Sequence, residues 1–465
     1  MRIFSADGVY VVACPDVGAL SVLSPMGLGA FLAWFDGTSE SEVRRRLAGY
    51  SSAFRGGCES SEDEWIASFL ARLRCEGWMR TSHPETKSDA GPLVSIYFTI
   101  TRACNLSCPY CYQGLEDRRR RVMTRADAIH ILAQVRAVNP ACRVCVTGGE
   151  PLLHPQFFDI LQAVESHGFF FSLLSNGTLI DERCAERLSE FRNLQNVQVS
   201  IDGIRPETHA ITRGDSFEAT MRGIEHLAKA GVPYSLAPTL HQRNLHEAVD
   251  LARLAYGNGG NFTPNFLRVF PWNPRHELRA TGPEVSDAIE RVGELAAREF
   301  QDVVTEGMNE GSGHYRAKLE RERLRYHCGA GKHLLDIDWD GTVYPCNLLK
   351  EERFVMGNVI EEDLRTILAG AHGAAFNVRS TAIDRCRECI LVSVCGGGCR
   401  AAAYYASGAF DREDDLCNVL FDWTVRRLLR QDAGDTSPLP DRLVSLGEIR
   451  RSHHTSDTTE SPRRH

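Results

Sequence analysis

The stretch Thr101-Arg-Ala-Cys104-Asn-Leu-Ser-Cys108-Pro-Tyr-Cys111 directly follows an apolar run, 93–99, that predicts a buried strand. Three cysteines on one short loop can bind three irons of a cubane cluster and leave the fourth iron open to a substrate. A structural zinc site would instead require four protein ligands, usually as two closely spaced pairs. The spacing therefore favours an iron-sulfur site at the end of this strand.

Strand-like and helix-like patterns alternate on both sides of this loop. Apolar runs typical of buried strands lie at 93–99, 143–147, 169–175, 197–201, 234–238 and 266–270, and helical patterns lie between them at 125–138, 156–166, 183–191, 217–230 and 245–255. Six such repeats predict a parallel sheet, open or partly closed. The predicted fold class is α/β, with a partial (β/α)6 parallel barrel at its centre.

The rest of the 465-residue chain divides by composition. Capped helical patterns follow short strand-like runs near the start, and cysteine and glycine crowd the last third. We expect a winged helix-like domain at 1–82, a linker at 83–92, the barrel at 93–280, a helical bridge at 281–327, a cysteine-rich iron-sulfur domain at 328–431 and a disordered tail at 432–465.

Composition excludes several classes of protein. Hydrophobic residues make up 43% and charged residues 25% of the chain, as in globular proteins, and no apolar run is long enough to span a membrane. The formal charge of −8 disfavours nucleic acid as a partner. Without a secretory signal, 16 cysteines indicate metal or redox ligands in a cytoplasmic protein and not disulfides.

Glycine and polar side chains follow the next three predicted strands. Gly148, Gly149 and Glu150 come after the second strand, Asn176 ends the third, and Ser200 and Asp202 end the fourth. The carboxyl ends of parallel strands are where such folds bind ligands. Glycine permits close backbone approach, and a carboxylate can accept from an ammonium group. For Asn176 and Asp202, capping of the loop is the alternative interpretation.

The cysteine loop and these strand ends together resemble the radical S-adenosylmethionine (radical SAM) family. The resemblance implies that Cys104, Cys108 and Cys111 bind a [4Fe-4S] cluster whose open iron binds the amino and carboxylate groups of S-adenosylmethionine. It places Tyr110 near the adenine and Ser200 at the ribose. A reductant such as flavodoxin or ferredoxin is implied as a partner. The implied cofactor-binding residues are Tyr110, Gly148, Gly149, Glu150, Asn176, Ser200 and Asp202.

Seven further cysteines crowd the last third of the chain, at 328, 346, 386, 389, 395, 399 and 417. Seven thiols exceed the needs of one tetrahedral metal, which indicates two iron-sulfur centres or two zinc ions. The spacing resembles the SPASM domain, which holds two auxiliary iron-sulfur clusters. The resemblance assigns one complete cluster to Cys386, Cys389, Cys395 and Cys417, and the other to Cys328, Cys346 and Cys399.

The second of these clusters lacks a fourth cysteine. Its last iron is open to a peptide thiol, or takes Glu322, His327 or water. In sulfatase maturases an Asp that acts as base follows the cysteine that matches Cys346, but here that residue is Asn347, which cannot accept a proton at neutral pH. Oxidation of a side chain to formylglycine is therefore disfavoured.

Cys142 and Cys145 form a further CxxC pattern, within a predicted strand. Strand residues three apart point to opposite faces, so this pair cannot share a metal without a bulge. We expect both residues to be packed thiols.

The front domain has three interpretations: a DNA-binding winged helix, a leader-peptide recognition domain, and a domain that only packs on the enzyme. Its 8 Lys and Arg against 10 Asp and Glu disfavour DNA. The patterns LSPxGxxAFLxxFDGT from Leu23 and WxxxFLxxLxxxG from Trp65 resemble the pyrroloquinoline-quinone biosynthesis chaperone. That resemblance implies that a leader peptide adds as a strand near Ala19 to Ser24.

We therefore expect a radical SAM oxidoreductase that matures a ribosomally synthesised peptide. Through a 5′-deoxyadenosyl radical it would install a C–S or C–C crosslink, with epimerisation and decarboxylation as open alternatives. The rival enzymes are a protein side-chain oxidase that resembles sulfatase maturases, and a radical enzyme acting on a small molecule. An electron-transfer protein is disfavoured because it needs neither an open iron nor the strand-end motifs. No catalytic residue is assigned.

Overall fold

Two compact units make up the computed structural model of the chain. One contains Met1–Thr86, Asp384–Gly396 and Leu420–His465, and the other contains Lys87–Ile383 and Gly397–Val419. The structure describes residues 2–6, 9–14, 19–23, 31, 93–113, 121–300, 328–370, 376, 378–387, 389, 391 and 395–421.

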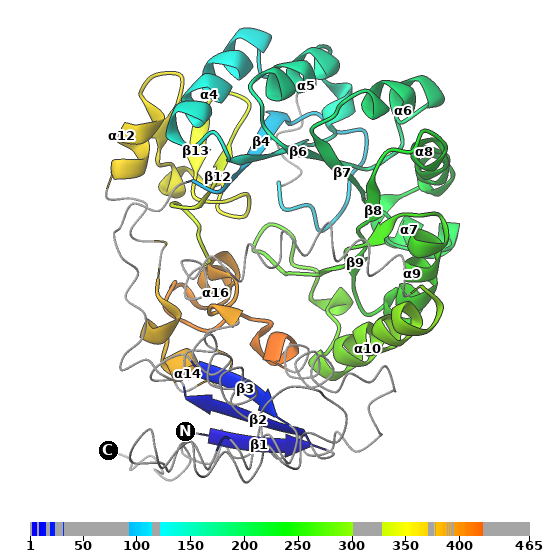
Figure 1. Ribbon diagram of the computed structural model, residues 1–465, viewed down its shortest axis with the longest axis vertical. Coiled ribbons are helices and arrows are strands. Elements are labelled where there is room, and N and C mark those ends of the chain that lie inside the picture. The colour runs from blue at the N-terminus through cyan, green and yellow to red at the C-terminus, as the bar shows by residue number, and fades with distance from the viewer. Residues whose placement is uncertain are drawn as a thin grey trace, which may run out of the picture. The chain divides into compact units, whose positions relative to one another are not determined.

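The larger unit is built on a curved sheet that runs β10-β8-β7-β6-β5-β4-β12-β13-β14 (Figure 1). From β10 to β12 all neighbours are parallel, as the alternating repeats predict. The strands supplied by the repeats are β4 (Ser95–Thr101), β5 (Arg143–Gly148), β6 (Phe171–Ser175), β7 (Leu194–Val199), β8 (Tyr234–Leu236) and β10 (Asn261–Phe262).

Helices cover the outer side of this curved sheet (Figure 1). N-cap side chains fix the starts of several helices. Thr124 accepts from Asp127 N–H, and Asp181 accepts from Cys184 N–H. These helices are α4 (Arg125–Val138), α5 (Phe157–Ser166), α6 (Glu182–Ser189), α7 (Pro206–Arg213), α8 (Phe217–Lys229), α9 (Ala248–Gly257), α10 (Gly282–Glu299) and α12 (Leu364–Ala369). A further helix of this unit, α16 (Arg400–Ser407), does not belong to the outer layer (Figure 1).

The two faces of the sheet differ in polarity. Ile96, Phe98 and Ile100 of β4 are fully buried in the main hydrophobic core, whereas Thr99, between them, hydrogen-bonds to Asp336 on β12. Strand residues alternate between faces, so the apolar residues pack under the helices and the inner face carries polar groups. This polar inner face leads to the carboxyl ends of the strands.

The sixth predicted strand, 266–270, is wrong in position. The sheet instead ends with β10, and a short pair of β9 (Thr239–Leu240) and β11 (Asn265–Phe266) lies beyond it. Pro264 separates β10 from β11 because proline cannot donate to a strand ladder. The N–H of Phe270 donates to Asn273 Oδ1 at 2.6 Å, which makes a turn where the prediction placed a strand end.

The cysteine-rich region supplies three further strands of the same sheet. β12 (Leu334–Ile337) lies parallel to β4, and β13 (Thr342–Tyr344) and β14 (Gly357–Asn358) follow it in antiparallel order. These strands were not predicted. The radical SAM-like repeats and the start of the cysteine-rich region therefore share one sheet and one hydrophobic core.

The smaller unit contains the antiparallel sheet β1-β2-β3, formed by β1 (Arg2–Ala6), β2 (Val9–Cys14) and β3 (Ala19–Leu23), and the short helix α14 (Asp384–Arg387). The short strand-like runs expected near the start of the chain correspond to β2 and β3. The predicted front helices, the linker, the tail, Glu322 and His327 lie outside the described residues. Among the helices that the structure describes, none has the length and apolar content of a membrane span.

Candidate cofactor pocket and cysteine sites

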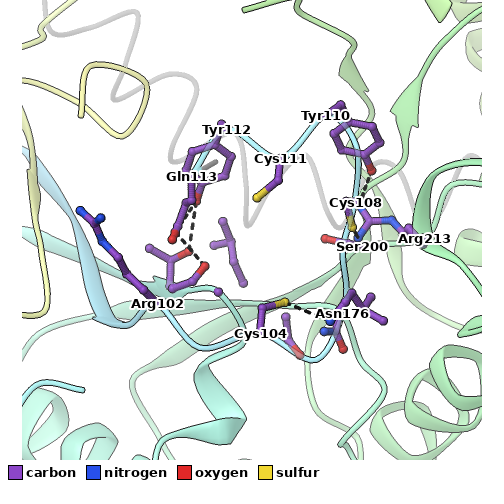
Figure 2. Close-up of a pocket in the computed structure, with 16 residues that line it drawn as sticks. Arg102, Cys104, Cys108, Tyr110, Cys111, Tyr112, Gln113, Asn176, Ser200 and Arg213 are labelled. Carbon is purple, nitrogen blue, oxygen red and sulfur yellow. Dashed lines mark hydrogen bonds between the residues drawn. The ribbon is translucent and has the colours of Figure 1, made fainter. Parts of the chain in front are cut away.

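Cys104, Cys108 and Cys111 line one pocket at the carboxyl ends of the strands of the larger unit. Figure 2 shows their sulfur atoms directed toward the same space. The pocket encloses about 820 Å³ of empty space, its open mouth included. Its wall also contains Gly148 and Gly149. The structure thus brings the cysteine loop and the glycine motif together, as the sequence predicts.

The two glycines allow the end of β5 to approach the cysteine loop. Gly149 N–H donates to Thr101 O at 2.9 Å, and Glu150 N–H donates to Ala103 O at 2.7 Å. A Cβ on Gly149 would lie 2.3 Å from Ala103 O. Only glycine fits such a contact, so this turn fixes the backbone from which Cys104 projects.

Glu150 lies behind the pocket wall, with its carboxylate fully buried. Its Oε1 accepts from Ser175 Oγ at 2.9 Å and its Oε2 from Asn176 N–H at 2.7 Å. Burial raises the pKa of Glu150 to about 7, although these hydrogen bonds oppose the shift. Glu150 therefore joins the ends of β5 and β6, and its predicted contact with a ligand ammonium stays a prediction.

Asn176 and Ser200, which directly follow β6 and β7, both line the pocket. The Nδ2 of Asn176 donates to Asn105 Oδ1 at 2.9 Å, and its Oδ1 accepts from Thr178 N–H at 2.9 Å. Asn176 is therefore a loop cap, the alternative considered above, as well as a link to the cysteine loop.

Asp202 is fully buried and does not line the pocket, but it holds residues that do. Its Oδ2 accepts from Tyr110 Oη and from Arg213 Nε, the latter at 2.8 Å. Arg213 Nη2 also donates to the Tyr110 hydroxyl at 2.7 Å. Burial alone would raise the pKa of Asp202, but Arg213 and Tyr110 outweigh burial and lower it.

Eight lining residues were not among the predicted site residues: Arg102, Leu106, Tyr112, Gln113, Thr147, Leu174, Ser175 and Arg213. Gln113 Nε2 donates to Gly148 O at 2.8 Å, and the Tyr112 hydroxyl lies 3.4 Å from Thr147 Oγ1 (Figure 2). Seven of them lie within two residues of a predicted site residue. Closeness in sequence to Cys104, Cys111, Gly148 and Asn176 could have indicated these seven, whereas Arg213 comes from α7.

The cysteines assigned to the incomplete auxiliary cluster interact with one another in the larger unit. Burial raises the pKa of the Cys346 thiol, and negative charge on Cys399 and Cys328 raises it further. Burial likewise raises the pKa of Cys399, although Arg268 opposes the shift. Such electrostatic effects act only between neighbouring groups, so Cys328, Cys346 and Cys399 lie near one another, and their joint binding of one cluster stays a prediction.

The four cysteines assigned to the complete auxiliary cluster fall in different units. Cys386, Cys389 and Cys395 belong to the smaller unit, where Cys389 N–H donates to Cys386 O at 3.0 Å. Cys417 belongs to the larger unit. Their joint assignment to one cluster stays a prediction.

Cys142 and Cys145 are free thiols. Burial raises the pKa of each to about 12, so both are neutral. This agrees with the interpretation of the pair as packed thiols.

The spacing of the cysteine side chains fits an iron-sulfur cluster and not a single metal ion. Among the described residues, no three His, Cys, Asp or Glu side chains converge on a point where one metal ion could bind. A cubane places each cysteine on a different iron, so it requires a wider set of thiols around an open space. Cys104, Cys108 and Cys111 around their pocket provide such a set.

Comparisons with known proteins agree with this geometry. The model of the radical SAM superfamily matches residues 98–255, and that of the SPASM iron-sulfur cluster-binding domain matches residues 328–390. An AdoMet-dependent heme synthase of Methanosarcina barkeri is 28% identical over 69% of this chain and 95% of its own length. The mycofactocin maturase MftC of Mycobacterium ulcerans is 26% identical over 70% of this chain and 87% of its own length.

Solved structures share the fold. The structure of anSMEcpe with bound AdoMet has a TM-score of 0.59 at 20% identity and covers 78% of this chain and 99% of its own. Streptococcus suis SuiB, bound to its precursor peptide SuiA, has a TM-score of 0.58 at 14% identity and covers 90% of this chain and 100% of its own.

The two matched domains settle the cofactors, which are a [4Fe-4S] cluster with S-adenosylmethionine and auxiliary iron-sulfur clusters. The pocket with its three cysteines lies within the first domain, and Cys328 and Cys346 lie within the second. The chain thus contains a radical SAM domain at residues 98–255 and a SPASM iron-sulfur cluster-binding domain at residues 328–390.

Proposed function

We propose that this enzyme matures a ribosomally synthesised peptide by forming a C–S or C–C crosslink within it. The [4Fe-4S] cluster with S-adenosylmethionine supplies, when bound, a 5′-deoxyadenosyl radical that removes a hydrogen atom from the substrate. Closure of the crosslink would release one proton and one electron, and an auxiliary cluster held by the SPASM cysteines would accept that electron. Cys104, Cys108 and Cys111 would hold that cluster. Asn176 and Ser200, together with Tyr110 as held by Asp202 and Arg213, would orient the rest of the cofactor.

The observation that carries this proposal is the share of this chain that each relative matches. The heme synthase of M. barkeri matches almost its whole length to 69% of this chain, so nearly a third of this chain has no counterpart there. SuiB, which was captured with a precursor peptide, covers 90% of this chain. The match to SuiB therefore extends over more of this chain than the match to the heme synthase, which supports a peptide substrate.

The front sheet offers a place for a leader peptide. Within the described residues β3 pairs with β2 on one side, and its other edge has no strand partner. An extended peptide can add to such an edge through main-chain hydrogen bonds. We infer that the leader binds along β3, next to Ala19–Leu23, in the cytoplasm.

The sequence identities of the relatives favour a second candidate function, the modification of a porphyrin. The heme synthase is slightly more similar to this chain than MftC is, so a porphyrin carboxylate is the rival substrate. Oxidation of a protein side chain to formylglycine is disfavoured because Asn347 has no proton-accepting group at neutral pH.

The test is co-expression, without oxygen, of the enzyme with each short peptide encoded beside it. Intact enzyme should remove two hydrogen atoms from one peptide, seen as a mass loss that fragmentation then locates. The Cys104→Ala variant should give no loss. A Cys142→Ala variant should act like the parent, because Cys142 is a packed thiol outside the pocket.

Other outcomes separate the alternatives. Deuterium uptake from heavy water without oxidative mass loss would indicate epimerisation. Loss of carbon dioxide from an added iron porphyrin, with every peptide unchanged, would replace the peptide by the porphyrin as substrate. Unchanged peptides and porphyrin, with intact clusters, would contradict both candidates.

A further inference from the structure

Four charged side chains meet on the inner face of the sheet, behind the cofactor pocket. We call Arg102, Asp336, Asp338 and Lys350 the inner ion network. Arg102 lies two residues before Cys104 and lines the pocket. Asp336 is on β12, Asp338 follows that strand, and Lys350 lies four residues after Cys346.

The contacts form a continuous chain from the cysteine loop to the SPASM domain. Arg102 Nε donates to Asp338 Oδ2 at 3.0 Å, and its Nη2 contacts the same oxygen. Lys350 Nζ lies 3.6 Å from that oxygen and 2.9 Å from Asp336 Oδ1. It also donates to Thr99 Oγ1, on β4, at 3.2 Å.

Three of the four side chains are buried, Arg102 is 21% exposed, and the charges of the network balance. The side chains of Asp336 and Asp338 are 0% and 1% exposed, and that of Lys350 is 9% exposed. Two acids face two cations, and Lys350 alone touches both acids. Buried ion networks contribute little net stability, because apolar residues of similar volume commonly do as well. A defined geometry is what such a network supplies.

We propose that Lys350 is a positioning residue that ties the backbone before Cys104 to the loop after Cys346, so that the cofactor pocket and the auxiliary cysteine group keep one relative arrangement. The inference concerns the radical SAM reaction itself and does not depend on whether the substrate is a peptide. Groups that hold ligand-bearing loops from behind commonly change metal binding or activity when they are removed.

Two variants separate positioning from charge balance. Lys350→Met removes the contacts of Lys350 with Thr99, Asp336 and Asp338. Among the described residues, Asp336 then keeps Thr99 as its hydrogen-bond donor. The double variant Lys350→Met with Asp336→Asn removes one acid as well, so the network is neutral again but still lacks the tie. Lys229→Met is the matched control, because Lys229 is exposed at the end of α8.

Three measurements are made on each protein. The first is the unfolding temperature of the metal-free protein. The second is the EPR spectrum of the reduced first cluster with S-adenosylmethionine. The third is the rate at which dithionite-reduced enzyme cleaves S-adenosylmethionine without any other substrate.

We expect Lys350→Met to lower the unfolding temperature, to shift the EPR spectrum and to slow cleavage by about 10- to 100-fold. The double variant should recover the unfolding temperature but neither the spectrum nor the cleavage rate. If the double variant recovers all three, Lys350 only balances charge and the proposal is wrong. An unchanged spectrum and rate in Lys350→Met would overturn it as well.

Discussion

Arg213 Nη2 lies 2.7 Å from the hydroxyl oxygen of Tyr110, and Nε of the same guanidinium lies 2.8 Å from Asp202 Oδ2. The last residue of α7 is thus bound to the loop that carries Cys108 and Cys111. Arg213 Nη1 also lies 4.0 Å from Cys108 Sγ. One buried cation therefore joins a helix, a strand end and the cysteine loop.

Replacing Arg213 by Gln should destabilise the protein strongly. It would leave the carboxylate of Asp202 buried without its cation, which typically costs about 3–5 kcal/mol. Urea unfolding of the metal-free protein measures this change. Arg253→Gln is the control and should have little effect, because its ion pairs are exposed. Equal stability of the two variants would show that Arg213 does not support the loop.

Replacing Gly149 by Ala should distort the cysteine loop. The new methyl group would lie 2.3 Å from Ala103 O, so the strand end and the loop must move apart. We expect a loss of about 1–3 kcal/mol and weaker binding of S-adenosylmethionine, measured by unfolding and by calorimetry on the reconstituted enzyme.

Gly257→Ala is the matched control for this substitution. A Cβ on Gly257, in α9, would have no atom within 4 Å, and the backbone there is not left-handed. A change within about 0.5 kcal/mol is expected there. If Gly149→Ala behaves like Gly257→Ala, the close approach does not constrain the loop.

Glu150 should make folding stability depend on pH. Its pKa in the folded protein is about 7, above its ordinary value of 4.5. Between these values the folded protein binds more protons than the unfolded chain. Stability from this group is therefore complete at low pH and falls as the pH rises from about 4.5 to about 7, by at most about 1.4 kcal/mol per pH unit.

The variant Glu150→Gln isolates this contribution. Its stability should lack the Glu150 component of the slope, so the parent should become less stable relative to the variant as the pH rises through that window. Above about pH 7 the difference in unfolding free energy between the two proteins should be constant. Urea unfolding of both metal-free proteins at a series of pH values measures this difference. A constant difference throughout the window would mean that Glu150 is ionised in both the folded and the unfolded state.

The iron content should identify the cysteines that bind clusters. Cys104→Ala should lose the iron of the first cluster and keep the auxiliary iron, whereas Cys399→Ala should lose auxiliary iron only. Cys184→Ala should keep all of it, because Cys184 is a buried helix residue with a pKa of about 12. Iron analysis with EPR of anaerobically purified protein measures this, and iron loss in Cys184→Ala would contradict the assignment.

Local spacing was enough to predict that the three cysteines of the first loop meet at one pocket. Cys104, Cys108 and Cys111 lie on one loop, and the strand before them and the glycines after β5 are short-range patterns. The parallel order of the strands predicts that the strand-end residues lie near this loop, because the carboxyl ends of parallel strands meet at one edge. Helix α4 was predicted with its observed bounds, since Thr124 and the apolar period mark it clearly.

Long-range pairing was beyond such reasoning. The bond between Tyr110 and Asp202 joins residues 92 positions apart, and that between Thr99 and Asp336 joins residues 237 apart. The strand predicted at 266–270 failed because Pro264 and the turn closed by Asn273 outweighed the apolar pattern. Composition also could not show that Asp336, Asp338 and Lys350 would converge.

The pairing of β12 with β4 also bears on how such enzymes can be recombined. A gene fusion that exchanged everything after residue 327 would remove the strand beside β4 and uncover the edge next to the cysteine loop. Such an edge invites pairing between molecules. Chimeras should therefore keep 334–358 with the parent barrel and exchange only residues beyond 358, because this segment completes the barrel sheet although it lies within the SPASM match.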